Sequence, residues 1–363
     1  MNNLFRAFLP YLLVGLLALV IEWAFGWGRL LVPWAEVSLG GLLVAVALML
    51  ASHVLRAWRV ADHFDIRGRF GAVLSLNLQH NLWNNLLPMR AGELSFPILM
   101  RQRFGTDPAH ALAGLFWIRL VDAQVLAALA LGSLLWLAKV EVVALLLVGL
   151  ALIAPFVFWS LRGWLGRWVE ENGRGEFADD RNLVIASEAK QSSTCEESAQ
   201  HGSPRRFAPR DDEVQLQSRG EKGWKSRASS LLRKVLAGLP RDAAHFARGV
   251  LLTWANWLVK LVVLAWILRQ FLAIDWAGAG LGVLGGEVTS VLPIHAPGGF
   301  GTYEAGMLGA LLPQGLELAA ATGAAINTHL FLVGSSLLFG LGAMLIPGKS
   351  ATMPAPAKDK NTP

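Results

Sequence analysis

Apolar stretches of membrane-spanning length recur along the chain and are separated by short polar or basic segments. A helix needs roughly 20 mostly apolar residues to cross the hydrocarbon core of a bilayer. The stretches of this kind are residues 8–25, 37–55, 109–138, 142–161, 250–272 and 316–346. They predict an all-α fold, a polytopic bundle of helices that is integral to a membrane.

Two further apolar stretches are shorter and are interrupted by proline and glycine. Residues 70–104 carry several amide side chains and a break at Pro88, and residues 277–312 are glycine-rich with a break at Pro293. Proline ends the helix that precedes it, and amides are costly in lipid, so they should face other helices or a wet cavity. Both segments are therefore predicted to be broken, re-entrant hairpins.

The basic residues predict which ends of the spans are cytoplasmic. Arg56, Arg59, Arg67 and Arg69 are interpreted as a loop after the second span, and the central loop and the C-terminal tail are also rich in Lys and Arg. Because cytoplasmic loops collect these residues, both termini are expected inside. The two hairpins then start from opposite sides, which is the layout of an inverted repeat whose interrupted segments mark a binding site.

Charge and polarity divide the chain into four parts. Residues 1–161 and 249–347 are expected to form two membrane halves, joined by a cytoplasmic loop at 162–248, with a disordered cytoplasmic tail at 348–363. The middle of the loop, residues 179–220, has the Ser-, Glu- and Arg-rich composition of disordered segments. It resembles peptides encoded by mobile palindromic repeats of bacterial genomes, so it is either a tolerated insertion or an ordinary linker.

The composition agrees with a membrane protein and excludes several other classes. The chain is 54% hydrophobic and 16% charged, whereas soluble domains carry about 25% charged residues. The net charge of +6 is explained by cytoplasmic loops rather than by nucleic acid. Cys195 is the only cysteine, and the histidines are scattered, so we expect no metal site and no bound cofactor.

The glycines from Gly280 to Gly285 match a dinucleotide fingerprint, but without a preceding strand they favour close helix packing.

Two similar constellations lie at the breaks of the hairpins. Each runs from Leu-Pro through a glycine-containing turn to a glutamate that begins a new helix, within residues 84–93 and 291–304. One interpretation is a pair of helix caps. The other is a substrate-binding site, because ionisable residues inside a membrane are usually functional. The candidate residues are Asn85, Arg90, Glu93, Pro297, Gly298, Gly299, Gly301 and Glu304.

Arg119 and Asp122 add a charged pair within an apolar run. They are three residues apart and share a helix face. They could simply neutralise one another. Alternatively, Arg119 could bind a lipid phosphate, which suits a guanidinium, while Asp122 holds it in place.

The strings from Asn85 to Glu93 (NLLPMRAGE), from Arg119 to Asp122 (RLVD) and from Leu292 to Glu304 (LPIHAPGGFGTYE) resemble the flippase-like membrane domain of lysylphosphatidylglycerol synthases and its stand-alone relatives. The resemblance covers the chain except the central loop and the tail. The family usually has an acid before the arginine of the second motif, where this chain has Ile118. The resemblance implies a lipid-handling membrane protein without the soluble aminoacyl-transferase module of the complete synthases.

The leading functional hypothesis is a flippase or transporter that moves a phosphate-bearing lipid across a bacterial inner membrane. The expected partners are membrane lipids: a phospholipid, an aminoacyl-lipid or a polyprenyl-phosphate-linked cargo. An integral-membrane transferase, with Glu93 or Glu304 as base, is an alternative. A non-catalytic partner of enzymes that make lipids, lipid-linked glycans or hopanoids is another.

Overall fold

A computed structural model describes most of the predicted membrane region. The described residues are 26–137, 139–143, 145–157, 159–161, 238–240, 242–290 and 297–345, with scattered positions between 12 and 23 and at 164 and 167. Most of the expected first span, and the whole of segment 179–220 and of the tail, lie outside the described residues.

Long helices form the expected bundle, and the described residues contain no strand. Within this part of the chain, five helices are long and apolar enough to cross a membrane, which confirms the all-α, polytopic prediction. Short helical turns, α2 (Trp27–Leu31) and η1 (Val32–Glu36), precede the first of them. The candidate spans are α3 (Leu39–His63), α6 (Pro108–Leu137), the helix Glu141–Leu161, α9 (Ala243–Phe271) and α12 (Leu318–Leu345).

Helix α3 is longer than its apolar pattern predicts. It begins where the hydroxyl of Ser38 accepts a hydrogen bond from the backbone N–H of Gly41, a typical N-cap. It continues to His63, so Arg56 and Arg59 lie inside the helix, and their assignment to a loop was wrong. Of the four basic residues, only Arg67 and Arg69 lie in the connection, in the turn η2 (Arg67–Arg69). Because arginine is a good helix former, the helix continues through Arg56 and Arg59 beyond the end of the apolar run.

The first predicted hairpin is a helix, a tight turn and a second helix. Helix α4 (Phe70–Leu86) is followed by the 3₁₀ turn η3 (Pro88–Leu94) and by α5 (Ser95–Phe104). The turn lies directly on α4, since a Cβ atom at Gly92 would approach the backbone of Trp83 and Asn84 to 2.4 Å. Buried amides of α4 contact protein: Gln79 donates to the carbonyl of Ala343 at 3.0 Å, as expected for polar groups inside a bundle.

The second hairpin has the same sequence of elements. Its helices are α10 (Trp276–Ser290) and α11 (Thr302–Leu311), with the turn η4 (Pro297–Gly299) before α11 and η5 (Leu312–Gln314) after it. The two helices touch through glycine: a Cβ at Gly285 would lie 2.3 Å from the carbonyl oxygen of Gly306. Close packing therefore explains Gly285, whereas a Cβ at Gly280 would meet nothing within 4 Å.

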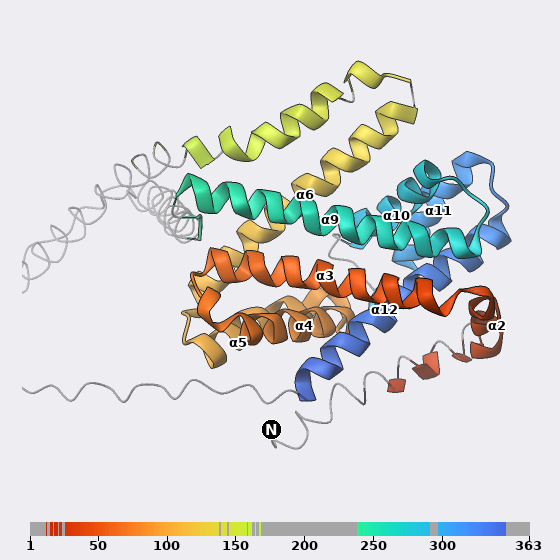
Figure 1. Ribbon diagram of the computed structural model, residues 1–363, viewed down its shortest axis with the longest axis horizontal. Helices are drawn as coiled ribbons and strands as arrows, with labels where there is room; N and C mark the ends of the chain where they lie inside the picture. Colours follow the sequence, from red (N-terminus) through yellow and green to blue (C-terminus); the bar gives the residue numbers. More distant parts are fainter. Residues whose placement is uncertain are drawn as a thin grey trace, which may run out of the picture. The chain divides into compact units, whose positions relative to one another are not determined.

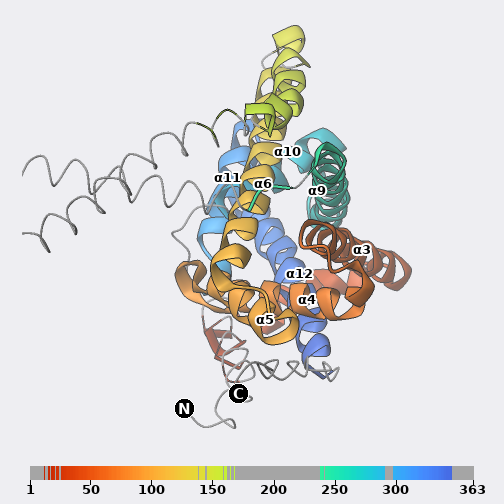
Figure 2. The ribbon, with the colours of Figure 1, turned by 90° about the vertical axis from the view of Figure 1, so that its left-hand side faces the viewer.

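The helices pack through several apolar clusters, of which the largest joins α3, α9, α10, α11 and α12. Helices α3 and α9 lie side by side, α4 packs against α12, and α10 packs against α11 (Figures 1 and 2). Fully buried side chains from α3, α9 and α11, including Met49, Leu268 and Met307, fill the space between them. These elements belong to one compact unit, residues 1–156 and 240–363, whereas residues 157–239 group separately. The inverted repeat stays a prediction.

A polar cavity within the membrane bundle as the candidate site

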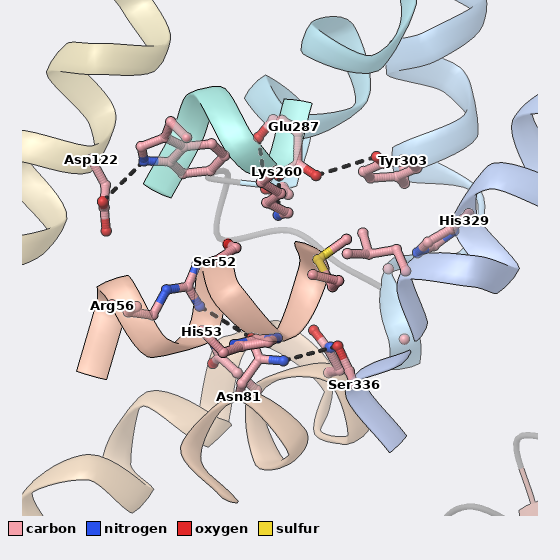
Figure 3. Close-up of a pocket in the computed structure, with 18 of the residues that line it drawn as sticks. Ser52, His53, Arg56, Asn81, Asp122, Lys260, Glu287, Tyr303, His329 and Ser336 are labelled. Atoms are coloured by element: carbon pink, nitrogen blue, oxygen red, sulfur yellow. Dashed lines mark hydrogen bonds and ion pairs between the residues drawn. The ribbon is translucent and has the colours of Figure 1, made fainter. Parts of the chain in front are cut away.

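A polar cavity lies where both hairpins meet the long helices. Its volume is about 130 Å³, and one buried water needs only about 10–15 Å³ of such space. Side chains from α3, α9, α10, α11 and α12 point toward it (Figure 3). It is lined by Met49, Ser52, His53, Arg56, Asn81, Asn84, Asn85, Leu87, Arg119, Asp122, Trp257, Lys260, Glu287, Ser290, Gly298, Gly299, Thr302, Tyr303, His329, Leu332 and Ser336.

Asp122 is held by donors from two other helices. Nη1 and Nη2 of Arg59 lie 2.7 and 3.2 Å from its two oxygens, and both side chains are only 4% exposed. The indole N–H of Trp257 donates to the same carboxylate at 3.0 Å. Arg59 also donates to the hydroxyl of Thr253 at 2.6 Å. A buried charge needs such compensation, so Asp122 ties α6 to α3 and α9.

Arg119 lies between two carboxylates. Its nearest acid is Glu93, with 2.8 Å between Nη2 and Oε1, and Asp122 is farther away at 3.5 Å. Glu93 also accepts a hydrogen bond from the amide of Asn84 at 3.1 Å and lies 3.4 Å from Nε2 of His80. The expected pair of Arg119 and Asp122 is therefore one edge of a larger network, and Glu93 links the first hairpin to α6.

A second ion pair joins α9 to the second hairpin. Nζ of Lys260 lies 2.7 Å from Oε2 of Glu287, and the two side chains are 12% and 1% exposed. The hydroxyl of Tyr303 donates to the other oxygen of this carboxylate at 3.3 Å. Glu287 therefore has a cation and a hydroxyl donor on opposite sides (Figure 3).

Glu304 organises the turn that precedes α11. One oxygen accepts the backbone N–H of Gly301 at 2.7 Å, and the other lies 2.6 Å from Nδ1 of His329. An ionised carboxylate only accepts hydrogen bonds, so Nδ1 is the donor in this pair. The imidazole of His329 stacks on Tyr303 with ring centroids 4.4 Å apart. Glu304 therefore caps α11, and the same side chain also orients His329, which lines the cavity.

Arg56 differs from the other cations of the cavity. Its hydrogen bond is to a neutral amide oxygen, that of Asn81, at 3.3 Å, and no carboxylate in the described part of the chain lies within 4.0 Å of its guanidinium. Its Nε is buried without a hydrogen-bond partner, as are the Nε atoms of Arg59 and Arg119. Nδ1 of His53, one helical turn away on α3, is also buried without a partner. The cavity is therefore bordered by a buried donor, Nε of Arg56, and by a buried imidazole nitrogen, Nδ1 of His53, that lack partners within the described residues.

The family model described as the lysylphosphatidylglycerol synthase TM region matches residues 8–340. The chain belongs to this family. No curated protein and no solved structure matches this chain. Membership identifies an integral, multi-pass membrane protein linked to lipid metabolism or transport, and it confirms the resemblance carried by the three motifs.

The cavity brings together half of the residues that the family motifs and the charged pair predicted. Asn85, Arg119, Asp122, Gly298 and Gly299 line it. The two glycines of the turn have left-handed φ angles of 71° and 78°, which other residues rarely adopt.

The remaining predicted residues lie elsewhere. Glu93 and Glu304 are behind the wall, each bonded to a lining side chain, and Gly301 contributes its backbone N–H to Glu304. The side chains of Arg90 and Pro297 lie outside the described residues.

Sequence reasoning missed several residues that line the cavity. Arg56 was interpreted as part of a cytoplasmic loop, and Lys260, within the apolar run 250–272, was not among the candidate residues. A signal existed for both Lys260 and Glu287, because an ionisable residue within a membrane helix is a functional candidate by default. His53 and His329 carried no such signal, since a lone histidine on an apolar helix is uninformative until its neighbours are known.

Proposed function

We propose that the protein is a flippase or transporter that moves a phosphate-bearing lipid across the inner membrane, with the headgroup bound in the polar cavity. The observation that carries this proposal is the guanidinium of Arg56, which faces the cavity and pairs with no carboxylate in the described residues. A cation left unpaired inside a membrane bundle is costly. An anionic ligand would compensate it, and a guanidinium suits phosphate.

The surrounding ion pairs support a role in movement as well as in binding. Arg119 lies 2.8 Å from Glu93 and 3.5 Å from Asp122. If Arg119 turned toward a headgroup, Asp122 would still be neutralised by Arg59 at 2.7 Å. Glu93 would lose its nearest cation but keep the amide of Asn84 at 3.1 Å, with Nε2 of His80 at 3.4 Å. The wall can therefore offer a second cation while both acids retain polar partners, which favours a site that binds and releases its cargo.

Lipid translocation in proteoliposomes tests the proposal. The purified protein is reconstituted with a fluorescent anionic phospholipid, and the fraction bleached by an impermeant reductant is followed with time. Wild type should bleach inner-leaflet lipid faster than empty liposomes. Arg56→Gln should slow this by about tenfold or more, since a hydrogen bond to a charged group contributes about 1.5–3 kcal/mol and 1.4 kcal/mol is a factor of ten.

A matched control separates the site from a general effect of charge. Arg101→Gln removes the same charge from an exposed position on α5 and should leave the rate unchanged. Equal rates for wild type and a folded Arg56→Gln variant would contradict the assignment of the cavity as the route of the lipid.

A further inference from the structure

We infer that the cavity selects lipids whose headgroup is net anionic and bears hydroxyl groups, and that it discriminates against headgroups carrying an amine. The inference rests on the proposed function, because it names the chemical class of lipid that the same cavity would take.

The two acids that line the cavity, Asp122 and Glu287, are each paired with a cation. Asp122 has Arg59 at 2.7 Å, and Glu287 has Lys260 at 2.7 Å. Both carboxylates also accept a hydrogen bond from an aromatic side chain, Trp257 or Tyr303. Neither offers a vacant negative charge to a lipid ammonium group.

The acids behind the wall are engaged in the same way. Glu93 has Arg119 at 2.8 Å, together with the amide of Asn84. Glu304 is bonded through both oxygens, to the backbone of Gly301 and to His329. Within the described residues, no carboxylate at this cavity is left without a donor, so an incoming ammonium would have to displace Arg119 from Glu93 or break the hydrogen bonds of Glu304.

Among the cations of the cavity, Arg56 has no carboxylate partner within the described residues. Arg56 points into the cavity, and within the described residues its hydrogen bond is to Asn81, with its Nε unpartnered. His53 is three residues earlier on the same helix face, is 6% exposed and has an unpartnered Nδ1. A phosphodiester accepting hydrogen bonds from Arg56 and from His53, in its tautomer with the proton on Nδ1, would satisfy two buried groups at once. A cationic group here would be repelled by Arg56 and Lys260.

Neutral hydrogen-bonding groups complete the wall of the cavity. Oδ1 of Asn84 is buried without a partner, although its amide nitrogen donates to Glu93. With Nδ1 of His329 donating to Glu304, Nε2 of a neutral imidazole is left as an acceptor. Both acceptors suit a hydroxyl of the headgroup, which also resolves the unsatisfied amide oxygen.

Three fluorescent lipids with the same acyl chains and different headgroups test the selectivity. They are phosphatidylglycerol (anionic, with hydroxyls), phosphatidylethanolamine (zwitterionic, with an amine) and lysylphosphatidylglycerol (net cationic). In the proteoliposome assay, phosphatidylglycerol should move about tenfold faster than either amine lipid, which corresponds to about 1.4 kcal/mol. Arg56→Gln should remove this preference, and His53→Leu should reduce it by roughly 2- to 10-fold, as expected for one hydrogen bond. Arg101→Gln is again the control.

Retention of the same lipids by the detergent-purified protein, measured by native mass spectrometry, gives a readout that does not need transport. Phosphatidylglycerol should be retained over both amine lipids in wild type, and not in Arg56→Gln. If the amine lipids move or bind as well as phosphatidylglycerol, the selectivity is overturned and the transport proposal stands. If phosphatidylglycerol binds selectively but no lipid moves faster than in empty liposomes, transport is overturned and the selectivity stands. If nothing binds or moves, both fail.

Discussion

Nη1 of Arg59 lies 2.7 Å from Oδ1 of Asp122, and this buried pair joins α3 to α6 across 63 residues of sequence. Helices in lipid gain little from the hydrophobic effect when they associate, so packing and polar contacts hold them together. The pair belongs to the network that includes Arg119 and Glu93. The same residues that shape the cavity are therefore also among those that hold the bundle together.

Removing one partner of this pair should destabilise the fold. Asp122→Asn leaves the guanidinium of Arg59 buried and uncompensated, which typically costs about 3–5 kcal/mol. Thermal unfolding of the detergent-purified protein should show a clear fall in the midpoint. Glu36→Gln, which also replaces a carboxylate by an amide but at an exposed position, should leave the unfolding midpoint unaltered. If both variants unfold at the wild-type temperature, the pair contributes nothing measurable to stability.

The close contact between α10 and α11 predicts that replacing Gly285 destabilises the fold. Gly285→Ala would place a methyl group 2.3 Å from the carbonyl of Gly306, so the helices must separate, at a cost of about 1–3 kcal/mol. Gly280→Ala is the control on the same helix, because its methyl group meets nothing within 4 Å. It should be neutral or stabilising by up to about 1 kcal/mol. Equal unfolding midpoints for the two variants would contradict the packing geometry.

The predicted orientation can be tested with the native cysteine. Cys195 is the only cysteine and lies in the segment expected to be cytoplasmic, so an impermeant maleimide should label it only after the inner membrane of spheroplasts is opened. Glu36→Cys in a Cys195→Ser background should be labelled in intact spheroplasts, because it follows the first expected span. Labelling in the reverse order would mean that the whole topology is inverted.

Residues 179–220 are expected to be dispensable if they are a tolerated insertion. A chain lacking them should reach the membrane, unfold at the wild-type temperature and move lipid at the wild-type rate. Replacing the segment with a flexible linker of equal length controls for the spacing between the flanking segments. Loss of transport in both variants, with the fold intact, would show that the segment has a role of its own.

Local patterns predicted the long helices well and their ends less well. The apolar runs at 109–138 and 250–272 correspond to α6 (Pro108–Leu137) and α9 (Ala243–Phe271). Helix α9 begins earlier than its apolar run because Asp242 caps it, accepting the backbone N–H of His245 at 2.9 Å. This hydrogen bond also lowers the pKa of Asp242 below its ordinary value. The end of α3 was misplaced because a charged residue was taken as the end of a span.

The sequence by itself determined that the chain spans a membrane with helices, that two segments are broken by proline and glycine, and which family it belongs to. These properties follow from the order of residues over short stretches. Only the tertiary structure decided which charges have partners. Arg56 and Arg59 are three residues apart on α3 and look equivalent in the sequence, yet Arg59 meets Asp122 whereas Arg56 faces the cavity with a neutral amide. Pairing depends on which helices lie side by side, and no local pattern contains that information.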